Sequence, residues 1–157
     1  MTVLGIDPGT YESAWCILVS GVPVDFAKME NDQLRLWLAG ASEFPKSDTL
    51  VIEEMQSYGM PAGREMFETC FWSGRFVEAW GGNFVKLPRK EVVGHLCNSG
   101  RAKDANVRQA IIDRFGGKAA AIGTKKSPGP LYGMSKDCWS ACAIALTHYD
   151  RTREGKC

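Results

Sequence analysis

Cysteine and histidine motifs for metal binding are missing from this sequence. It has 2 histidines, His95 and His148, and they lack the spacing of metal ligands. Its 6 cysteines are scattered and form no Cys-Xaa-Xaa-Cys pair. Such cysteines are typical of reduced thiols in a cytosolic protein, where several pack as small apolar side chains. We therefore expect no structural zinc. The cysteines are Cys16, Cys70, Cys97, Cys138, Cys142 and Cys157.

Long apolar runs are also missing. No stretch approaches the roughly 20 apolar residues that cross a membrane. The N-terminus has no basic region followed by an apolar stretch and a cleavage site, so we expect no signal peptide. The 157 residues, 45% hydrophobic and 24% charged, fit one globular domain over 1–157 with a substantial core. We expect a cytoplasmic protein without membrane contact.

Net charge is nearly absent overall, but the charges are segregated along the chain. Residues 1–85 contain 5 basic and 12 acidic residues, a net charge of −7. Residues 86–126 contain 10 basic and 3 acidic residues, a net charge of +7. A basic block of this kind is either a solvated face or a surface that binds a polyanion. Both interpretations stay open at this point.

Apolar periodicity predicts an α/β layer arrangement. Strands are predicted over 2–7, 13–20, 22–29, 49–55 and 83–88. Helices are predicted over 31–40, with Asn31 or Asp32 as the N-cap, and over 63–80, 88–97, 102–116 and 136–149. Residues 116–134, rich in glycine, proline and lysine, are predicted to form a loop.

Three acidic residues stand where these elements end or begin. Asp7 and Glu53 end two apolar strands, and Asp137 lies in the first turn of the last helix. If the two strands are parallel neighbours, their carboxylates lie close together and repel unless a divalent cation binds them. Three such acids suit a two-metal phosphodiester site. Alternatively, Asp7-Pro8-Gly9 is only a turn, Asp137 only balances the helix dipole, and Glu53 or Glu54 lies at a solvated edge.

Four segments together resemble RuvC-type Holliday junction resolvases, in the RNase H-like superfamily. They are GIDPGT, VIEEM, PRKEVVGHLCNSGRAKDANVRQAI and KDCWSACAIALTH. The resemblance implies an α/β, RNase H-like fold: a five-stranded mixed sheet, three antiparallel strands and then parallel ones, flanked by helices. It implies a homodimer that nicks four-way and other branched DNA with Mg²⁺, or Mn²⁺ in its place, in a bacterial or phage-infected cell. It also implies two ions per active site, products with a 5′-phosphate and a 3′-hydroxyl, and Asp7, Glu53 and Asp137 as catalytic metal ligands.

The sequence departs from the family pattern at the fourth acid. Its place is taken by Ser140, whose hydroxyl is a weak, neutral metal ligand. The family's lysine after the Gly-Xaa-Ala turn also falls one position early, at Lys103. Two alternatives to a junction endonuclease stay open. One is a protein that binds junctions and cuts them weakly or not at all, and the other is an RNase H-fold nuclease acting on RNA–DNA hybrids.

Candidate DNA contacts lie mainly in the basic block. Cationic residues at predicted turns and helix starts are expected to bind phosphates: Arg89, Lys90, Arg101, Lys103, Lys125 and Lys126. Tyr58 and Met60, in the loop after Glu53, are expected to stack on an unpaired base at the junction centre. Ordinary packing of that loop is the alternative.

The predicted helix 63–80 is apolar on two sides. One side carries Met66, Phe67, Cys70, Phe71, Gly74 and Val77, and the other carries Trp72, Phe76, Ala79 and Trp80. One side must pack on the sheet. We predict that Trp72, Phe76 and Trp80 form the dimer interface. The alternative is that helix 31–40 covers them within one chain.

Overall fold

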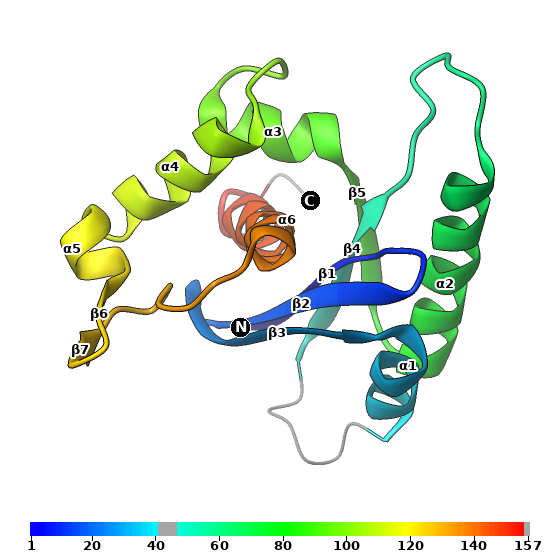
Figure 1. Ribbon diagram of the computed structural model, residues 1–157, viewed down its shortest axis with the longest axis horizontal. Coiled ribbons are helices and arrows are strands. Elements are labelled where there is room, and N and C mark those ends of the chain that lie inside the picture. The colour runs from blue at the N-terminus through cyan, green and yellow to red at the C-terminus, as the bar shows by residue number, and fades with distance from the viewer. Residues whose placement is uncertain (41–46, 156–157) are drawn as a thin grey trace.

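The structure is a computed structural model that describes residues 1–40 and 47–155. Its centre is a five-stranded sheet with the order β3-β2-β1-β4-β5 (Figure 1). β1, β2 and β3 are antiparallel, whereas β4 and β5 run parallel to β1. The mixed sheet implied by the resemblance is therefore confirmed. The strands are β1 (Thr2–Asp7), β2 (Glu12–Val19), β3 (Val22–Glu30), β4 (Thr49–Glu54) and β5 (Phe84–Pro88).

Helices cover both faces of the sheet. α1 and α2 pack against each other on one face, and α6 lies along β1 and β2 on the other, with α3 and α4 arching over it (Figure 1). This arrangement places the start of α6 at the edge where β1 and β4 end. The helices are α1 (Asn31–Ala39), α2 (Arg64–Trp80), α3 (Arg89–Cys97), α4 (Asp104–Arg114) and α6 (Lys136–Arg153).

Alternating side chains of the strands build two separate cores. Even-numbered residues of β1, such as Leu4 and Ile6, pack with α1 and α2. Val3, on the opposite face, packs with α6. Asp7 has the same parity as Val3, so the strand delivers its carboxylate to the α6 face.

The predicted loop over 116–134 is wrong in part. It contains the one-turn helix α5 (Lys118–Ala121) and a short hairpin of β6 (Gly123–Thr124) and β7 (Ser127–Pro128). Gly129 lets this segment fold back tightly, because a Cβ atom there would lie 2.2 Å from the carbonyl oxygen of Ala120. The high glycine content therefore serves compact turns.

The predicted dimer interface on α2 is wrong for Phe76. This side chain is fully buried against the core that includes Leu34 and Leu38 of α1, and Trp72 and Trp80 pack on the same core. The alternative, in which helix 31–40 covers this side of α2, is the one the structure supports. Phe67 and Phe71, on the side expected to face the sheet, are exposed.

Two further observations concern membrane-spanning helices and the cysteines. Within 1–40 and 47–155, no helix is long and apolar enough to cross a membrane. The thiols of Cys16, Cys70, Cys97, Cys138 and Cys142 are free, and Cys157 lies outside the described residues.

Candidate active site

Asp7 and Glu53 are brought together by the parallel pairing of β1 and β4. Ile6 lies opposite Ile52 in this pairing, so the next residue of each strand stands at the same edge of the sheet. Their side chains form a hydrogen bond with each other. The expected proximity of the two carboxyl groups is confirmed, and their catalytic role stays a prediction.

A buried polar network fixes the turn that follows Asp7. The hydroxyl of Ser13 accepts a hydrogen bond from the Gly9 amide at 3.0 Å and donates to Oδ1 of Asn31 at 2.6 Å. The amide of Asn31 donates in turn to the Gly9 carbonyl at 2.9 Å. Asn31 therefore braces the turn and is not the N-cap of α1, a position that Glu30 occupies. Ser13 and Asn31 are each 1% exposed, so this brace is shielded from water.

Asp137 reaches the same edge because α6 lies directly on β1. A Cβ atom at Gly5 would come within 2.2 Å of the carbonyl oxygen of Ala141, so only glycine allows this approach. From Ala141 back to Asp137 is about 6 Å along a helix, and from Gly5 on to Asp7 is about 7 Å along a strand. Asp137 and Asp7 therefore lie at similar distances from this contact, at the same edge of the sheet.

A cavity of about 230 Å³ lies at this edge of the sheet. All three predicted acids and Ser140 line it, together with apolar side chains of α3, α4 and α6. Its charged and polar lining consists of Asp7, Glu53, Arg89, Asp104, Lys136, Asp137 and Ser140. The structure therefore assembles in one place the acids that the sequence supplied from β1, β4 and α6.

Asp7 and Glu53 form a pair that holds a proton. Burial, followed by the charge and hydrogen bond of Glu53 and the charge of Asp137, raises the pKa of Asp7 from 3.8 to about 8 against the lowering effect of Arg89. Burial also raises the pKa of Glu53, although the hydrogen bond from Asp7 and the charge of Arg89 oppose it. Asp7 therefore keeps a proton near neutral pH and donates it to Glu53.

Asp137 is ion-paired with a lysine of β3. Its Oδ2 lies 2.8 Å from Nζ of Lys28, and that Nζ also lies 3.4 Å from Oε2 of Glu12. In the part of the chain that the structure describes, no three acidic, histidine or cysteine side chains form a ready metal-binding group. The Asp7–Glu53 pair nevertheless fits one divalent cation, because Mg²⁺ binds one or two carboxylates with water and phosphate.

Three charged residues of this site were missed by the sequence analysis. Lys28 contacts Asp137, Asp104 is ion-paired with Arg89, and Lys136 lines the cavity beside Asp137. The position of Lys136 next to a predicted ligand was a usable signal. Lys28 and Asp104 come from other elements, and only strand register and helix docking reveal them.

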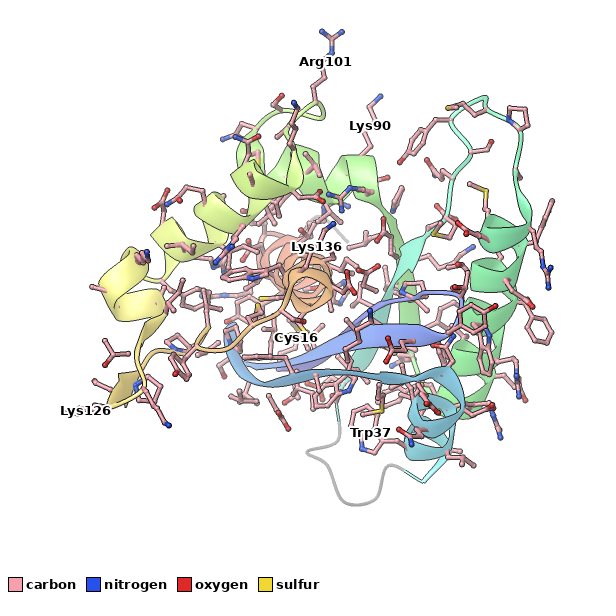
Figure 2. The ribbon with its side chains drawn as sticks, in the orientation of Figure 1. Cys16, Trp37, Lys90, Arg101, Lys126 and Lys136 are labelled. Atoms are coloured by element: carbon pink, nitrogen blue, oxygen red, sulfur yellow. The ribbon has the colours of Figure 1, made fainter. Side chains whose placement is uncertain are left out.

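Four of the predicted phosphate-binding residues lie on α3 or in the connection from α3 to α4, two helices that both contribute residues to the cavity. Arg89 lines it, and Lys90 and Arg101 are exposed near the α3–α4 connection, at the top of Figure 2. Lys103 is exposed just before α4 begins, and its backbone amide donates a 2.9 Å hydrogen bond to Asn106. Their contact with DNA stays a prediction.

The remaining predicted DNA contacts lie elsewhere. Lys126 lies at the far left end of the molecule on the β6–β7 hairpin, and Lys125 precedes it in the same turn (Figure 2). The structure does not bring these two lysines to the acids. Tyr58 and Met60, in the connection between β4 and α2, are 60% and 72% exposed. They are free to contact a ligand, and base stacking by them stays a prediction.

A larger cavity, of about 860 Å³, lies between the first turns of α1 and α2. Among the described residues that line it, none belongs to the predicted acid site. Its charged lining is mostly acidic and would repel DNA phosphates. This lining comprises Glu12, Glu30, Asp32, Arg64, Glu65 and Glu68.

Comparisons with known proteins support the fold. The sequence matches no protein-family model and no curated protein. A structure of Thermus thermophilus RuvC covers 99% of this chain and 98% of its own, with a TM-score of 0.74 and 17% identity. T. thermophilus RuvC in complex with a Holliday junction substrate gives a TM-score of 0.69 at 16% identity, covering 99% and 97% of the two chains. The fowlpox virus Holliday junction resolvase gives 0.56 at 13% identity, covering 96% and 99%. The chain therefore has the RNase H-like fold of RuvC.

Proposed function

We propose that this protein is a metal-dependent, structure-selective DNA endonuclease that resolves four-way junctions by paired nicks during recombination and repair. The observation that carries the proposal is one cavity that collects carboxylates from β1, β4 and α6 beside the basic side chains of Arg89 and Lys136. A fold does not define a function by itself. Similarity to a RuvC solved with a Holliday junction nevertheless supports the same substrate.

The Asp7–Glu53 pair would hold Mg²⁺, with Mn²⁺ as a substitute. The buried pair shares a hydrogen bond, and burial raises the pKa of each carboxyl group, so a bound divalent cation would balance their charges. When bound, the ion supplies Lewis-acid activation of water and neutralises charge on the leaving oxygen. The resemblance implies two ions, held by Asp7, Glu53, Asp137 and Ser140 together, and this expectation stays a prediction.

The side chains of the cavity would bind and orient the phosphodiester. Arg89 and Lys136 are placed to contact the non-bridging oxygens. Asp7 and Glu53, once deprotonated, would accept hydrogen bonds from the attacking water. As the new P–O bond forms, the bond between phosphorus and the 3′ oxygen breaks. The water loses a proton and the leaving oxygen gains one, which gives a 5′-phosphate and a 3′-hydroxyl.

Paired nicks require two active sites, and the exposed side of α2 supports a homodimer. Phe67 and Phe71, one helical turn apart, are 66% and 60% exposed. Gly74, on the same side, has no atom within 4 Å of the position that a Cβ atom would take. A two-fold contact over this side would place one acid cluster on each half of a symmetric junction.

A junction-binding protein without cleavage is the second candidate function. The observation that favours it is the ion pair between Asp137 and Lys28, at 2.8 Å, which keeps one of the three acids occupied. Ser140, the only other oxygen donor of α6 that lines the cavity near Asp137 among the described residues, is neutral.

A substrate comparison tests the proposed function. A labelled four-way junction, a linear duplex and an RNA–DNA hybrid are each incubated with the protein in Mg²⁺, Mn²⁺ or EDTA. We expect metal-dependent cleavage of the junction alone. Glu53→Gln should abolish it, whereas the matched variant Glu54→Gln should not, because Glu54 lies outside the cavity and pairs with Lys86 at 3.2 Å.

The alternatives give different results in the same assay. Tight junction binding without cleavage in any metal would leave a binding protein. Preferred cleavage of the RNA–DNA hybrid would leave a nuclease of the RNase H type. Either result would refute the proposed function.

A further inference from the structure

A second cavity, of about 370 Å³, lies on the β3 side of the acid site. Asp7 and Asp137 line both this cavity and the one that holds Glu53, so the two carboxylates form the wall between them. The charged lining of the second cavity is completed by Lys28 and Glu12. The ammonium group of Lys28 therefore lies on one side of Asp137, and the predicted cation site lies on the other.

Strand register explains how Lys28 reaches this wall. Asp7 pairs with Ala14 across β1 and β2, and Ala14 pairs with Lys28 across β2 and β3. Directly paired residues point to the same face of a sheet, so the three side chains stand in one row. Neighbouring strands are about 4.8 Å apart, and the small, fully buried Ala14 leaves the path between them clear. The long lysine side chain crosses this gap and meets Asp137 at the start of α6.

The contact has the geometry of a strong ion pair but remains open to solvent. Nζ of Lys28 lies 2.8 Å from Asp137 and 3.4 Å from Glu12. The side chains of Lys28 and Asp137 are 38% and 41% exposed, so a dissolved cation can reach Asp137 and compete with the ammonium. Asp7 and Glu53, in contrast, are hydrogen-bonded to each other. No ion pair found among the described residues joins either of them to a lysine or an arginine.

We propose that Lys28 takes the place of a second divalent ion. Its ammonium group neutralises Asp137, so that each chain binds one ion, at Asp7 and Glu53, where the family resemblance implies two. A second ion binds at Asp137 only when Lys28 is displaced. This inference rests on the proposed cation site and is independent of which DNA is cut.

Counting bound ions tests the proposal. Isothermal titration calorimetry with Mn²⁺ would be carried out on the wild type, on Lys28→Met and on Lys86→Met. Lys86 is a matched control, because it is also a strand lysine paired with a glutamate, Glu54 at 3.2 Å, and it lines neither cavity. We expect one ion per chain for the wild type and for Lys86→Met, and two for Lys28→Met. Adding Asp137→Asn to Lys28→Met should return the count to one.

Two ions in the wild type, or one ion in Lys28→Met, would overturn the proposal. Lys28→Gln, which keeps a polar side chain, provides a second variant if Lys28→Met does not fold. The result also separates this inference from the proposed function. One ion in the wild type and two in Lys28→Met, without junction cleavage, would support Lys28 as the second cation and refute the nuclease. No bound Mn²⁺ in any of these proteins would refute the cation site and the Lys28 proposal together.

Discussion

Replacing Asp7 by asparagine should stabilise the folded protein at neutral pH when no divalent cation is present. The carboxyl group of Asp7 is held protonated by burial and by the neighbouring Glu53, which raise its pKa from 3.8 to about 8. Between these two values, the folded chain keeps a proton that the unfolded chain has lost. The contribution of Asp7 to the free energy of unfolding therefore falls as the pH rises from about 4 to about 8.

The size of the effect follows from the same two values. One pH unit corresponds to 1.36 kcal/mol, so the interval from 3.8 to pH 7 amounts to about 4 kcal/mol. Asparagine does not ionise, and its amide can donate the hydrogen bond that protonated Asp7 gives to Glu53. The variant should therefore gain up to this amount over the wild type at pH 7, and much less at pH 5.

Urea unfolding followed by circular dichroism, at pH 5 to 8 with EDTA, measures the difference. Asp113→Asn, at an exposed aspartate of α4, is the matched control and should follow the wild type. Adding Mg²⁺ at pH 7 should stabilise the wild type and leave Asp7→Asn nearly unchanged. An equal pH dependence of stability for the wild type and Asp7→Asn between pH 5 and 8 would contradict this prediction.

Three further predictions concern packing and assembly. Gly5→Ala should lower stability by about 2 kcal/mol, because the new methyl group would collide with the backbone of α6 at Ala141; an unchanged melting temperature would contradict this. Asp150→Ala should lower the free energy of unfolding, measured in urea, by about 3 kcal/mol, because Asp150 accepts two hydrogen bonds, at 2.6 and 2.7 Å, from Arg114. A loss of less than about 1 kcal/mol would show that this ion pair between α4 and α6 is unimportant for stability. Phe71→Glu should convert a dimer into a monomer in analytical ultracentrifugation without changing the circular dichroism spectrum, and a variant that stays dimeric would exclude this face.

The sheet and the position of its acids could be predicted from the sequence because the signals are local. The apolar runs that end in Asp7 and Glu53 define strands whose last residue leaves the core. Their pairing follows from the layer arrangement, and the structure confirms it. The first turn of α6, which carries Asp137, is likewise a local pattern of polar start and apolar continuation.

The orientation of α2 could not be predicted, because both of its sides are apolar. Periodicity shows that Phe71 and Phe76 lie on different sides, but not which side meets the sheet. The choice depends on α1, which packs on the side of Phe76 and buries it. This long-range contact has no local signal.

The ion pairs of the site were also beyond the reach of the sequence. Lys28 meets Asp137 only because two strand pairings and the docking of α6 bring them together. Arg89 meets Asp104 through the packing of α3 and α4. Charge patterning located the basic block but not the partner of each charge, and it placed Lys125 and Lys126 near acids from which the fold separates them.

Mapping the cuts on a four-way junction distinguishes a resolving nuclease from the alternative functions. Each of the four strands is labelled in turn, and the junction is incubated with the wild type or Asp7→Asn in Mg²⁺. We expect nicks at symmetry-related positions on two strands for the wild type and none for Asp7→Asn. An intact junction with the wild type, or equal cleavage by Asp7→Asn, would contradict this expectation.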